Sequence, residues 1–492
     1  MNFRLLYKVI GSLLFLLGAL LAACIALTVY YHEDDMAAFL ISSILTFSTG
    51  FVLKYLGRDA DNNLSRRDAY LLVTATWVVF SFFGMLPFLI GGYIPNVTDA
   101  FFETMSGFTT TGATILTNID ALPHTILYWR SLTQWIGGLG IVFFTIAILP
   151  SMVGSGSGSV KVFAAEATGP MRAKMHPRLS TMAKWIWTVY LALTIGCILS
   201  FCLCGMGWFD SINYALTTTA TGGFAPHSDA AYLEQNPAFS FRGATYVSAL
   251  FQFLAGINFA MLYMAVIKFR VRALFRSSEF KVYFAIVLLA TVFIAWLLVR
   301  NVGYGYEHAF RTSLFHVVSV MTTTGIFVDD LSRWPHITWV VLGSLMFLGA
   351  CAGSTTGGFK TIRGIMVFKV LRNEFRKSLH PNAVLPVKVN GQAIPQQKLS
   401  ALLAFFAIYT IMLVLTATIM ITAGIDNTNA ITIALSCMSN VGATLDTGIG
   451  TVMSWADLSV PLKWACTFLM LVGRLEIMSV LILFTPTFWK DN

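Results

Sequence analysis

The sequence carries little charge for a chain of 492 residues. Asp, Glu, Lys and Arg make up 11% of it and apolar residues 57%, whereas soluble domains hold about 25% charged residues. This composition excludes a soluble globular protein. The seven cysteines and eight histidines also lack the spacing of metal ligands, and no nucleotide-binding loop or serine–lysine pair is present. A membrane-embedded enzyme is therefore a disfavoured alternative, and no cofactor is expected.

Long uncharged runs stand in place of the missing charge. A helix needs about 20 apolar residues to cross a membrane, and runs such as 13–30 and 399–425 meet this requirement. The sequence therefore predicts an all-α, polytopic membrane protein. We expect ten spans, at 9–31, 37–56, 69–94, 126–150, 183–207, 243–268, 280–300, 337–369, 399–424 and 460–484.

Basic and acidic residues gather at opposite ends of these spans. If the N-terminus is cytoplasmic, most of the 32 Lys and Arg lie in cytoplasmic segments, with dense groups at 161–184, 268–281 and 360–398. This distribution satisfies the positive-inside rule. The outer segments carry carboxylates, Glu103 among them, which are either ordinary solvated residues or a cation-attracting mouth. The pattern predicts membrane lipid, and no nucleic acid, as a partner.

A short apolar connector recurs four times between spans, at intervals of more than about 100 residues. The connectors lie at 100–111, 211–221, 312–324 and 429–441, and each ends in a glycine-bearing turn. Each is too apolar for an exposed loop and too short to cross the membrane. The sequence therefore predicts four repeats of span, pore half-helix, turn and span around one pore. The matching glycines are Gly112, Gly222, Gly325 and Gly442.

A glycine turn at membrane depth must be buried in protein or line a water-filled cavity, because lipid cannot satisfy its amides. A half-helix that ends there points its negative C-terminus at the cavity, which favours a cation. Glycine lets successive carbonyls aim at one point, and rings of carbonyls can replace the hydration shell of K⁺. We therefore predict a selectivity filter formed by Thr110, Thr111, Gly112, Thr221, Gly222, Thr323, Thr324, Gly325, Asn440, Val441 and Gly442.

The motifs resemble those of the Trk/Ktr/HKT superfamily of potassium transporters, over nearly the whole chain. The matching segments are 101–113, 221–224, 321–325 and 473–476. The two N-terminal spans are similar to an extra helix pair of the TrkH/TrkG-type membrane subunits. The fourth turn departs from the family pattern, since Asn440-Val441 replaces Thr-Thr, which puts fourfold symmetry in question.

This resemblance implies further properties. The family's proteins are multi-pass proteins of the bacterial inner membrane with a cytoplasmic N-terminus. They take up K⁺ (Rb⁺ and Na⁺ being other candidate ions) through one pore per subunit. They also work as homodimers on a cytosolic, TrkA-like nucleotide-binding ring. An older view of the family, obligatory symport of K⁺ with H⁺ or Na⁺, is the alternative. Symport would require intramembrane carboxylates, and among those the sequence places only Glu476 deep in the membrane.

The eighth span contains a run of small residues at 349–359. Each glycine costs a helix about 1 kcal/mol relative to alanine, so the run predicts a break; close packing of helices is the alternative interpretation. By resemblance, the break is the intramembrane loop that obstructs the pore. The candidate gate residues are Gly349, Gly353, Ser354, Thr355, Thr356, Gly357, Gly358 and Arg474.

Arg474 lies midway along the last span, where an unpaired charge costs several kcal/mol. Residues two apart on a helix do not face each other, so Glu476 is a poor partner. We expect carbonyls of the intramembrane loop or a carboxylate beside the pore instead. Arg474 is then either a structural ion-pair member or, as the resemblance favours, a positive barrier below the filter.

The predicted organisation has seven parts along the chain. They are an N-terminal helix pair (1–66), repeat 1 (67–152), a cytoplasmic linker (153–180), repeat 2 (181–275), repeat 3 with its broken second helix (276–378), a second linker (379–396) and repeat 4 (397–492).

Overall fold

The structure is a computed structural model of the chain, and it describes residues 1–61, 64–140, 179–228, 239–445 and 455–490. Regular structure in these residues is helical except for one hairpin of two-residue strands, β1 (Lys388–Val389) and β2 (Gln392–Ala393). Most of the predicted linker at 153–180 falls on 141–178, outside the described residues. The predicted all-α class is confirmed.

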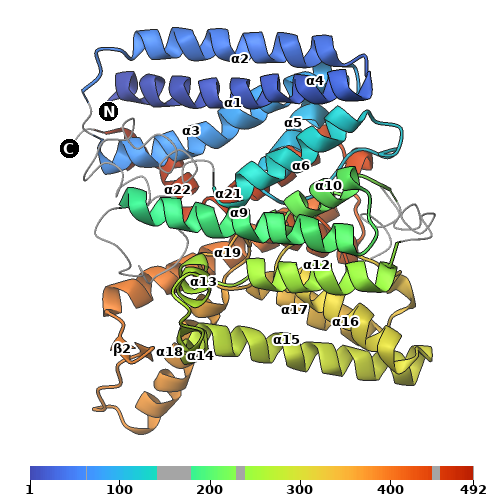
Figure 1. Cartoon of the computed structure of the whole chain (residues 1–492). Coiled ribbons are helices and arrows are strands. Elements are labelled where there is room, and N and C mark those ends of the chain that lie inside the picture. Colours follow the sequence, from blue (N-terminus) through green and yellow to red (C-terminus); the bar gives the residue numbers. More distant parts are fainter. Residues whose placement is uncertain (62–63, 141–178, 229–238, 446–454, 491–492) are drawn as a thin grey trace.

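Two long helices, α1 (Phe3–Tyr31) and α2 (Met36–Leu56), pack side by side at one edge of the molecule (Figure 1). Their backbones meet at glycines: a Cβ atom on Gly11 would lie 2.7 Å from the Gly50 carbonyl oxygen. Small residues permit this approach, and van der Waals packing is what holds helices together in lipid. The expected N-terminal pair is therefore present.

Each of the four repeats consists of a first helix, a pore helix and a second helix (Figure 1). The pore helix packs against the second helix of its own repeat and against that of the preceding repeat, with repeat 4 preceding repeat 1. The repeats therefore close around one axis, as predicted. Their helices are α3 (Arg66–Gly84), α5 (Val97–Phe108) and α6 (His124–Gly138); α9 (Leu179–Leu203), α10 (Trp208–Ala220) and α12 (Phe241–Ala255); α15 (Ser278–Leu297), α16 (Tyr306–Met321) and α17 (His336–Leu348); and α19 (Gln396–Thr422), α20 (Asn427–Ser439) and α21 (Val460–Arg474).

Further elements join these helices or continue them. They are α4 (Leu86–Ile90), α13 (Phe259–Val266), α14 (Arg272–Arg276), the π-helix η1 (Leu298–Val302), η2 (Leu331–Arg333), α18 (Thr361–Leu379), η3 (Trp455–Asp457), α22 (Ile477–Leu481), η4 (Ile482–Phe484) and α23 (Pro486–Trp489).

The described residues contain fewer uninterrupted spans than the ten expected. Six helices are long and apolar enough to cross a membrane, and two further helix pairs qualify only as bent spans. The chain is thus a multi-pass membrane protein, but the second helices of repeats 2, 3 and 4 are broken rather than continuous. The six helical segments are Phe3–Tyr31, Met36–Leu56, Arg66–Ile90, Ala183–Leu203, Ser278–Val302 and Gln396–Thr422.

The second helices of repeats 2 and 4 are sharply bent. The expected span 243–268 bends by 107° between α12 and α13, and 460–484 bends by 117° after α21. Asn258 caps the helix that follows the first break, since its side-chain oxygen accepts hydrogen bonds from the amides of Ala260 and Met261. In repeat 1, α6 ends at Gly138, and the rest of the expected span 126–150 lies largely outside the described residues. Hydropathy alone does not detect such breaks, because both halves are apolar.

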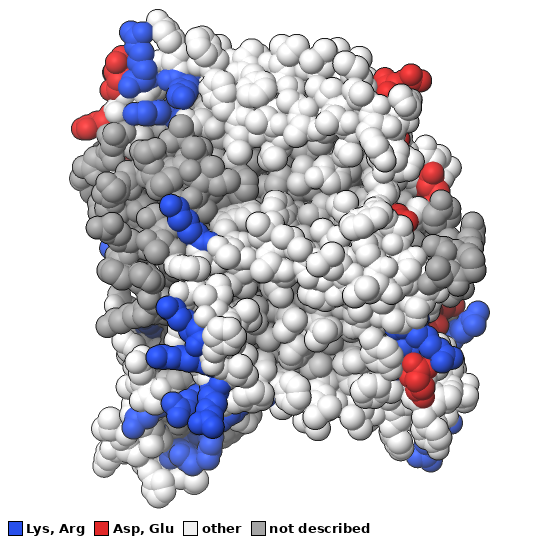
Figure 2. All heavy atoms as spheres, in the orientation of Figure 1, with Lys and Arg blue, Asp and Glu red and all other residues white. Residues whose placement is uncertain are grey.

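Charge is segregated on the surface. Figure 2 shows Lys and Arg gathered, with a smaller acidic group, along the edge where α14 and α18 lie, and a broad uncharged belt separates them from the opposite edge, which holds Asp and Glu with a smaller basic group. Such a belt is what a bilayer requires of the surface it covers.

Candidate ion-conducting site

The four pore helices end in turns of the same backbone conformation. The first residue with positive φ after each helix is Thr110, Thr221, Thr323 or Asn440, with φ of 53°, 54°, 57° and 57°. A non-glycine residue in this left-handed region costs of order 1–3 kcal/mol, and such strain is characteristic of functional sites. Two residues later a glycine with positive φ follows in every turn: Gly112, Gly223, Gly325 and Gly442.

The second turn therefore has a different register from the one predicted. We expected Gly222 to match Gly112, but the structure places Gly223 there and puts Gly222 in the position of Thr111, Thr324 and Val441. Because the turn contains two consecutive glycines, the sequence alone did not distinguish them.

Glycine contacts join the turns into a closed ring. A Cβ atom on Gly112 would lie 2.1 Å from the carbonyl oxygen of Gly222, and one on Gly223 would lie 1.9 Å from that of Thr324. The series continues from Gly325 to Val441 at 1.9 Å and from Gly442 to Thr111 at 2.1 Å. No side chain fits at these distances. The four predicted filter turns are thus brought together, each touching the next and the fourth touching the first.

Buried polar atoms line this ring. Thr110, Thr111 and Asn440 are at most 1% exposed. The Asn440 side-chain amide donates to Thr111 Oγ1 (3.0 Å) and to the Met470 carbonyl (2.8 Å). Thr110 Oγ1 and Asn440 Oδ1 are buried without a hydrogen-bond partner among the described residues. Buried oxygens normally find a partner, so these two atoms are candidates to contact a bound group.

The electrostatics of the ring suit a positive ion. Four pore helices of 12 to 16 residues converge with their C-terminal ends at the turns. Each such end carries a partial negative charge from unpaired carbonyls. The ring therefore combines a field that attracts cations with a set of oxygen atoms that can coordinate them.

The predicted break in the eighth span is present, between α17 and α18. Its residues 349–360 are non-helical, with positive φ at Gly349, Gly353 and Gly358. This intramembrane loop lies directly against the ring: the Gly357 amide donates to Thr323 Oγ1 (2.8 Å), and Thr355 Oγ1 is 3.2 Å from Thr221 Oγ1.

Arg474 finds its partners among backbone carbonyls, as we expected. Its guanidinium donates to the carbonyl of Thr355 in the intramembrane loop (2.7 Å) and to those of Gly137 (2.6 Å) and Gly138 (2.7 Å) at the end of α6. It therefore ties repeat 4 to repeat 1 and to the loop. Glu476 does not pair with Arg474; it forms an ion pair with Arg363 of α18.

Two buried carboxylates differ from the sequence-based expectation: Glu103 was expected among the outer carboxylates, and Glu279 was not singled out. Glu103 is not a solvated outer residue: it lies on pore helix α5, 1% exposed, and pairs with Arg130 of α6. Glu279 at the start of α15 is also buried and accepts the amide of Ala352 in the intramembrane loop (2.6 Å). Glu476 is thus not the only deep carboxylate. The signal for the first pair was available, since Arg130 lies within a predicted span and Glu103 within an apolar connector.

The chain is thus a multi-pass membrane protein in which four pore-helix turns close around a single axis. The TrkH family, described as cation transport proteins, matches residues 35–491. The chain belongs to this family, as its motifs suggested.

Several relatives cover the full chain. The Trk system potassium uptake protein TrkH of Salmonella typhimurium LT2 is 34% identical, and that of Vibrio parahaemolyticus is 35% identical, each covering 100% of both chains. The Trk system potassium uptake protein TrkG of Escherichia coli K12 is 30% identical over 99% of both chains. The crystal structure of the potassium transporter TrkH from Vibrio parahaemolyticus matches with a TM-score of 0.88 and 33% identity over 100% of both chains.

Proposed function

We propose that this chain is a potassium uptake protein that conducts K⁺ through the ring of four filter turns. The observation that carries this proposal is the closed series of glycine-to-carbonyl contacts around one axis. Peptide carbonyls in such a ring can replace the water around K⁺. Relatives of equal length are named potassium uptake proteins, which supports the same ion here.

The coordinating oxygens would come from successive layers of the turns. One layer consists of the carbonyls of Thr111, Gly222, Thr324 and Val441, and the next glycines extend it outward. A second layer lies at Thr110, Thr221, Thr323 and Asn440, where side-chain oxygens add to the carbonyls. The unpartnered Oδ1 of Asn440 would supply the oxygen that a threonine hydroxyl supplies elsewhere, so the departure of the fourth turn does not leave that layer one ligand short.

The intramembrane loop and Arg474 would form the gate beneath this filter. The loop contacts Thr221 and Thr323, whose hydroxyls belong to the second, inner layer of oxygens. Arg474 holds the loop in place through the Thr355 carbonyl and puts a positive charge below the filter. Opening would then require the loop to release the two threonines and Arg474 together.

We assign the basic edge in Figure 2 to the cytoplasm by the positive-inside rule. The chain would then lie in a bacterial inner membrane with its N-terminus inside. Helix α18 extends from the intramembrane loop into this basic region, where a cytosolic nucleotide-binding ring could move the loop in a homodimer.

Coupled symport with H⁺ or Na⁺ is less well supported. The buried Glu103 is held in an ion pair with Arg130, and Glu279 accepts a backbone hydrogen bond. Neither is arranged as a free proton carrier. Flux of K⁺ into proteoliposomes with neither a proton nor a sodium gradient would favour conduction, and its absence would favour symport.

The proposal is tested by Gly325→Ala in proteoliposomes loaded for ⁸⁶Rb⁺ or K⁺ uptake. A Cβ atom there would lie 1.9 Å from the Val441 carbonyl oxygen, so uptake should be lost. The matched control is Gly303→Ala, whose φ is also positive (79°) but which has open space around it. Selective uptake by Gly325→Ala at the wild-type rate would overturn the proposal.

A further inference from the structure

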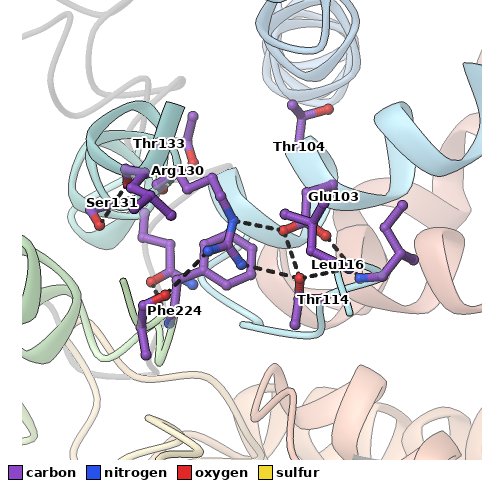
Figure 3. Close-up of polar contacts among 12 residues, drawn as sticks. Glu103, Thr104, Thr114, Leu116, Arg130, Ser131, Thr133 and Phe224 are labelled. Atoms are coloured by element: carbon purple, nitrogen blue, oxygen red, sulfur yellow. Dashed lines mark hydrogen bonds and ion pairs between the residues drawn. The ribbon is translucent and has the colours of Figure 1, made fainter. Parts of the chain in front are cut away.

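A network of buried polar side chains lies behind the first filter turn (Figure 3). Glu103 and Arg130 are each 1% exposed, and their Oε1 and Nε atoms are 2.9 Å apart. Thr114, two residues after Gly112, donates its hydroxyl to Glu103 Oε1 (2.9 Å), and the Ile115 amide donates to Oε2 (3.0 Å). One carboxylate thus holds the segment that leaves the first turn.

Arg130 also reaches the second turn. Its Nη1 donates to the Ala225 carbonyl (3.2 Å), its Nη2 to Thr114 Oγ1 (3.1 Å), and its guanidinium lies 4.2 Å from the centroid of the Phe224 ring. Phe224 and Ala225 directly follow Gly223. The planar guanidinium presents donors in a fixed fork, so it fixes the spacing between the segments that leave turns 1 and 2.

One helical turn further along α6, Gln134 makes a second connection to the same turn. Its Nε2 donates to the Gly222 carbonyl (2.8 Å), and its Oε1 accepts the Phe224 amide (3.0 Å). Gly222 contributes a carbonyl to the ring. Arg130 and Gln134 therefore attach α6 to turn 2.

The charged pair belongs to repeat 1 in the described part of the chain. The position nine residues before the filter glycine holds Glu103 in repeat 1, and Tyr214, His316 and Ile433 in the other three. In repeat 3, His316 Nε2 is 3.4 Å from the Val328 amide, the counterpart of the Ile115 amide. Repeat 2 has Pro226 at that place, which has no amide hydrogen. The backbone is repeated four times, but the ionic support is not.

A buried ion pair such as Glu103 with Arg130 is not in general required for the stability of a fold. Replacing a buried ion pair with well-packed apolar residues is often neutral or stabilising, so this pair is not needed merely to fill space. What it supplies is geometry, since five hydrogen bonds join one carboxylate, one guanidinium and the exits of two filter turns.

We propose that Glu103 and Arg130 are positioning residues that set the K⁺ over Na⁺ selectivity of the filter. This inference rests on the proposed function. The pair does not touch the ion, because the carboxylate is already occupied by Arg130, Thr114 and Ile115. It holds turns 1 and 2 at the separation that suits K⁺, and without it the carbonyls move closer and accept the smaller Na⁺.

The test measures K⁺ and Na⁺ fluxes separately in proteoliposomes. Glu103→Gln should lower the K⁺/Na⁺ flux ratio by roughly tenfold, which corresponds to about 1.4 kcal/mol, mainly by raising Na⁺ flux. The double variant Glu103→Leu/Arg130→Met removes both charges and should show the same loss of selectivity while folding normally. A merely structural pair would change the amount of folded protein, not the flux ratio.

Milder and control variants keep the test decisive. Thr114→Val removes one hydroxyl from the network and should lower the ratio by a smaller factor even if the other variants fail to fold. Asp99→Asn breaks the ion pair with Lys463 (2.7 Å) at the outer end of the same pore helix and should leave the ratio unchanged. Wild-type selectivity in any folded variant of Glu103 or Thr114 would overturn the inference. Absence of K⁺ flux in the wild type would instead overturn the proposed function.

Discussion

Filter turns 1 and 4 have the same backbone but different support. Both place a strained residue and a glycine at matching positions, Thr110 and Gly112 in one, Asn440 and Gly442 in the other. Behind turn 1 lies the charged pair of Glu103 with Arg130, whereas the position on α20 that matches Glu103 holds the buried, apolar Ile433.

Turn 4 is held instead by its own side chain. The Asn440 amide bridges to turn 1 through Thr111 Oγ1 and to α21 through the Met470 carbonyl. The ring geometry therefore restricts the backbone in every repeat, whereas the side chains that support this backbone differ from one repeat to the next. Substitutions in the backbone positions should therefore act alike in the two turns, and those in the supporting positions should not.

Substitution of the filter glycines should cause the largest loss of uptake, because both turns depend on the same backbone conformation. Gly112→Ala and Gly442→Ala would each put a Cβ atom 2.1 Å from a carbonyl oxygen of the neighbouring turn. Relief of such a clash requires the ring to open, and a distortion of about 3 kcal/mol lowers a rate roughly 100-fold. Uptake of ⁸⁶Rb⁺ should fall to a similar extent in both variants. Loss in only one would show that the two turns are not equivalent in backbone.

The next effect concerns the inner connection between the compared repeats. Arg474→Met removes the hydrogen bonds from repeat 4 to the carbonyls of Gly137, Gly138 and Thr355. Hydrogen bonds to charged groups contribute about 1.5–3 kcal/mol each, so the loop should detach and resting K⁺ flux should rise about tenfold. Arg474→Lys should restore part of the control. A flux equal to the wild type in Arg474→Met would argue against the gate.

A smaller effect is expected when turn 4 is made to resemble turn 1. Asn440→Thr keeps an oxygen in the inner layer but removes the amide that donates to Thr111 and Met470. Transport should persist, with a change of about fivefold in the K⁺/Na⁺ ratio, since each of the two lost hydrogen bonds is worth at least about 0.5 kcal/mol. Asn440→Ala removes the oxygen as well and should reduce flux further. Equal fluxes in both variants would exclude a coordinating role for this side chain.

The smallest effect concerns an outer contact between repeats 1 and 2. His227 lies between Asp210 (2.9 Å) and Asp120 (3.1 Å). Burial lowers the pKa of His227, but the hydrogen bonds and charges of Asp210 and Asp120 outweigh it and raise this pKa above its usual value. The protonated form then stabilises the fold below pH of about 6.5, and this contribution is lost as pH rises through the higher folded pKa.

This contribution should amount to less than about 1 kcal/mol, as is usual for ion pairs near the surface. The difference in melting temperature between the wild type and His227→Gln should therefore be largest near pH 6 and vanish at high pH. A difference that stays constant between these limits would show that His227 acts by packing rather than by charge.

Much of this architecture was predictable because it depends on repeated patterns. Four apolar connectors with glycine turns indicated the ring, and a run of small residues at 349–359 indicated the loop. The carbonyl partners of Arg474 followed from the cost of an unpaired charge in lipid. Each of these features depends on a short segment of the sequence, so it can be predicted without knowing which distant segments are in contact.

Other features depend on contacts between distant segments and were not predictable in this way. The register of turn 2 is decided by the contact of Gly223 with the Thr324 carbonyl, which two adjacent glycines do not reveal. The helix after the bend at α12 is capped by Asn258, a feature that a hydropathy profile does not record. The sequence indicated an outer carboxylate at Glu103, because its partner Arg130 lies 27 residues away in the chain and beside it only in the fold.

In the proposed mechanism, four turns surround a dehydrated K⁺ on one axis. Anomalous diffraction from crystals grown in Rb⁺ tests it most directly, with Gly325→Ala crystals as the comparison. We expect anomalous peaks on the axis among the carbonyls of Thr111, Gly222, Thr324 and Val441, and their loss in the variant. Peaks elsewhere in a transport-competent protein, with none within this ring, would contradict it.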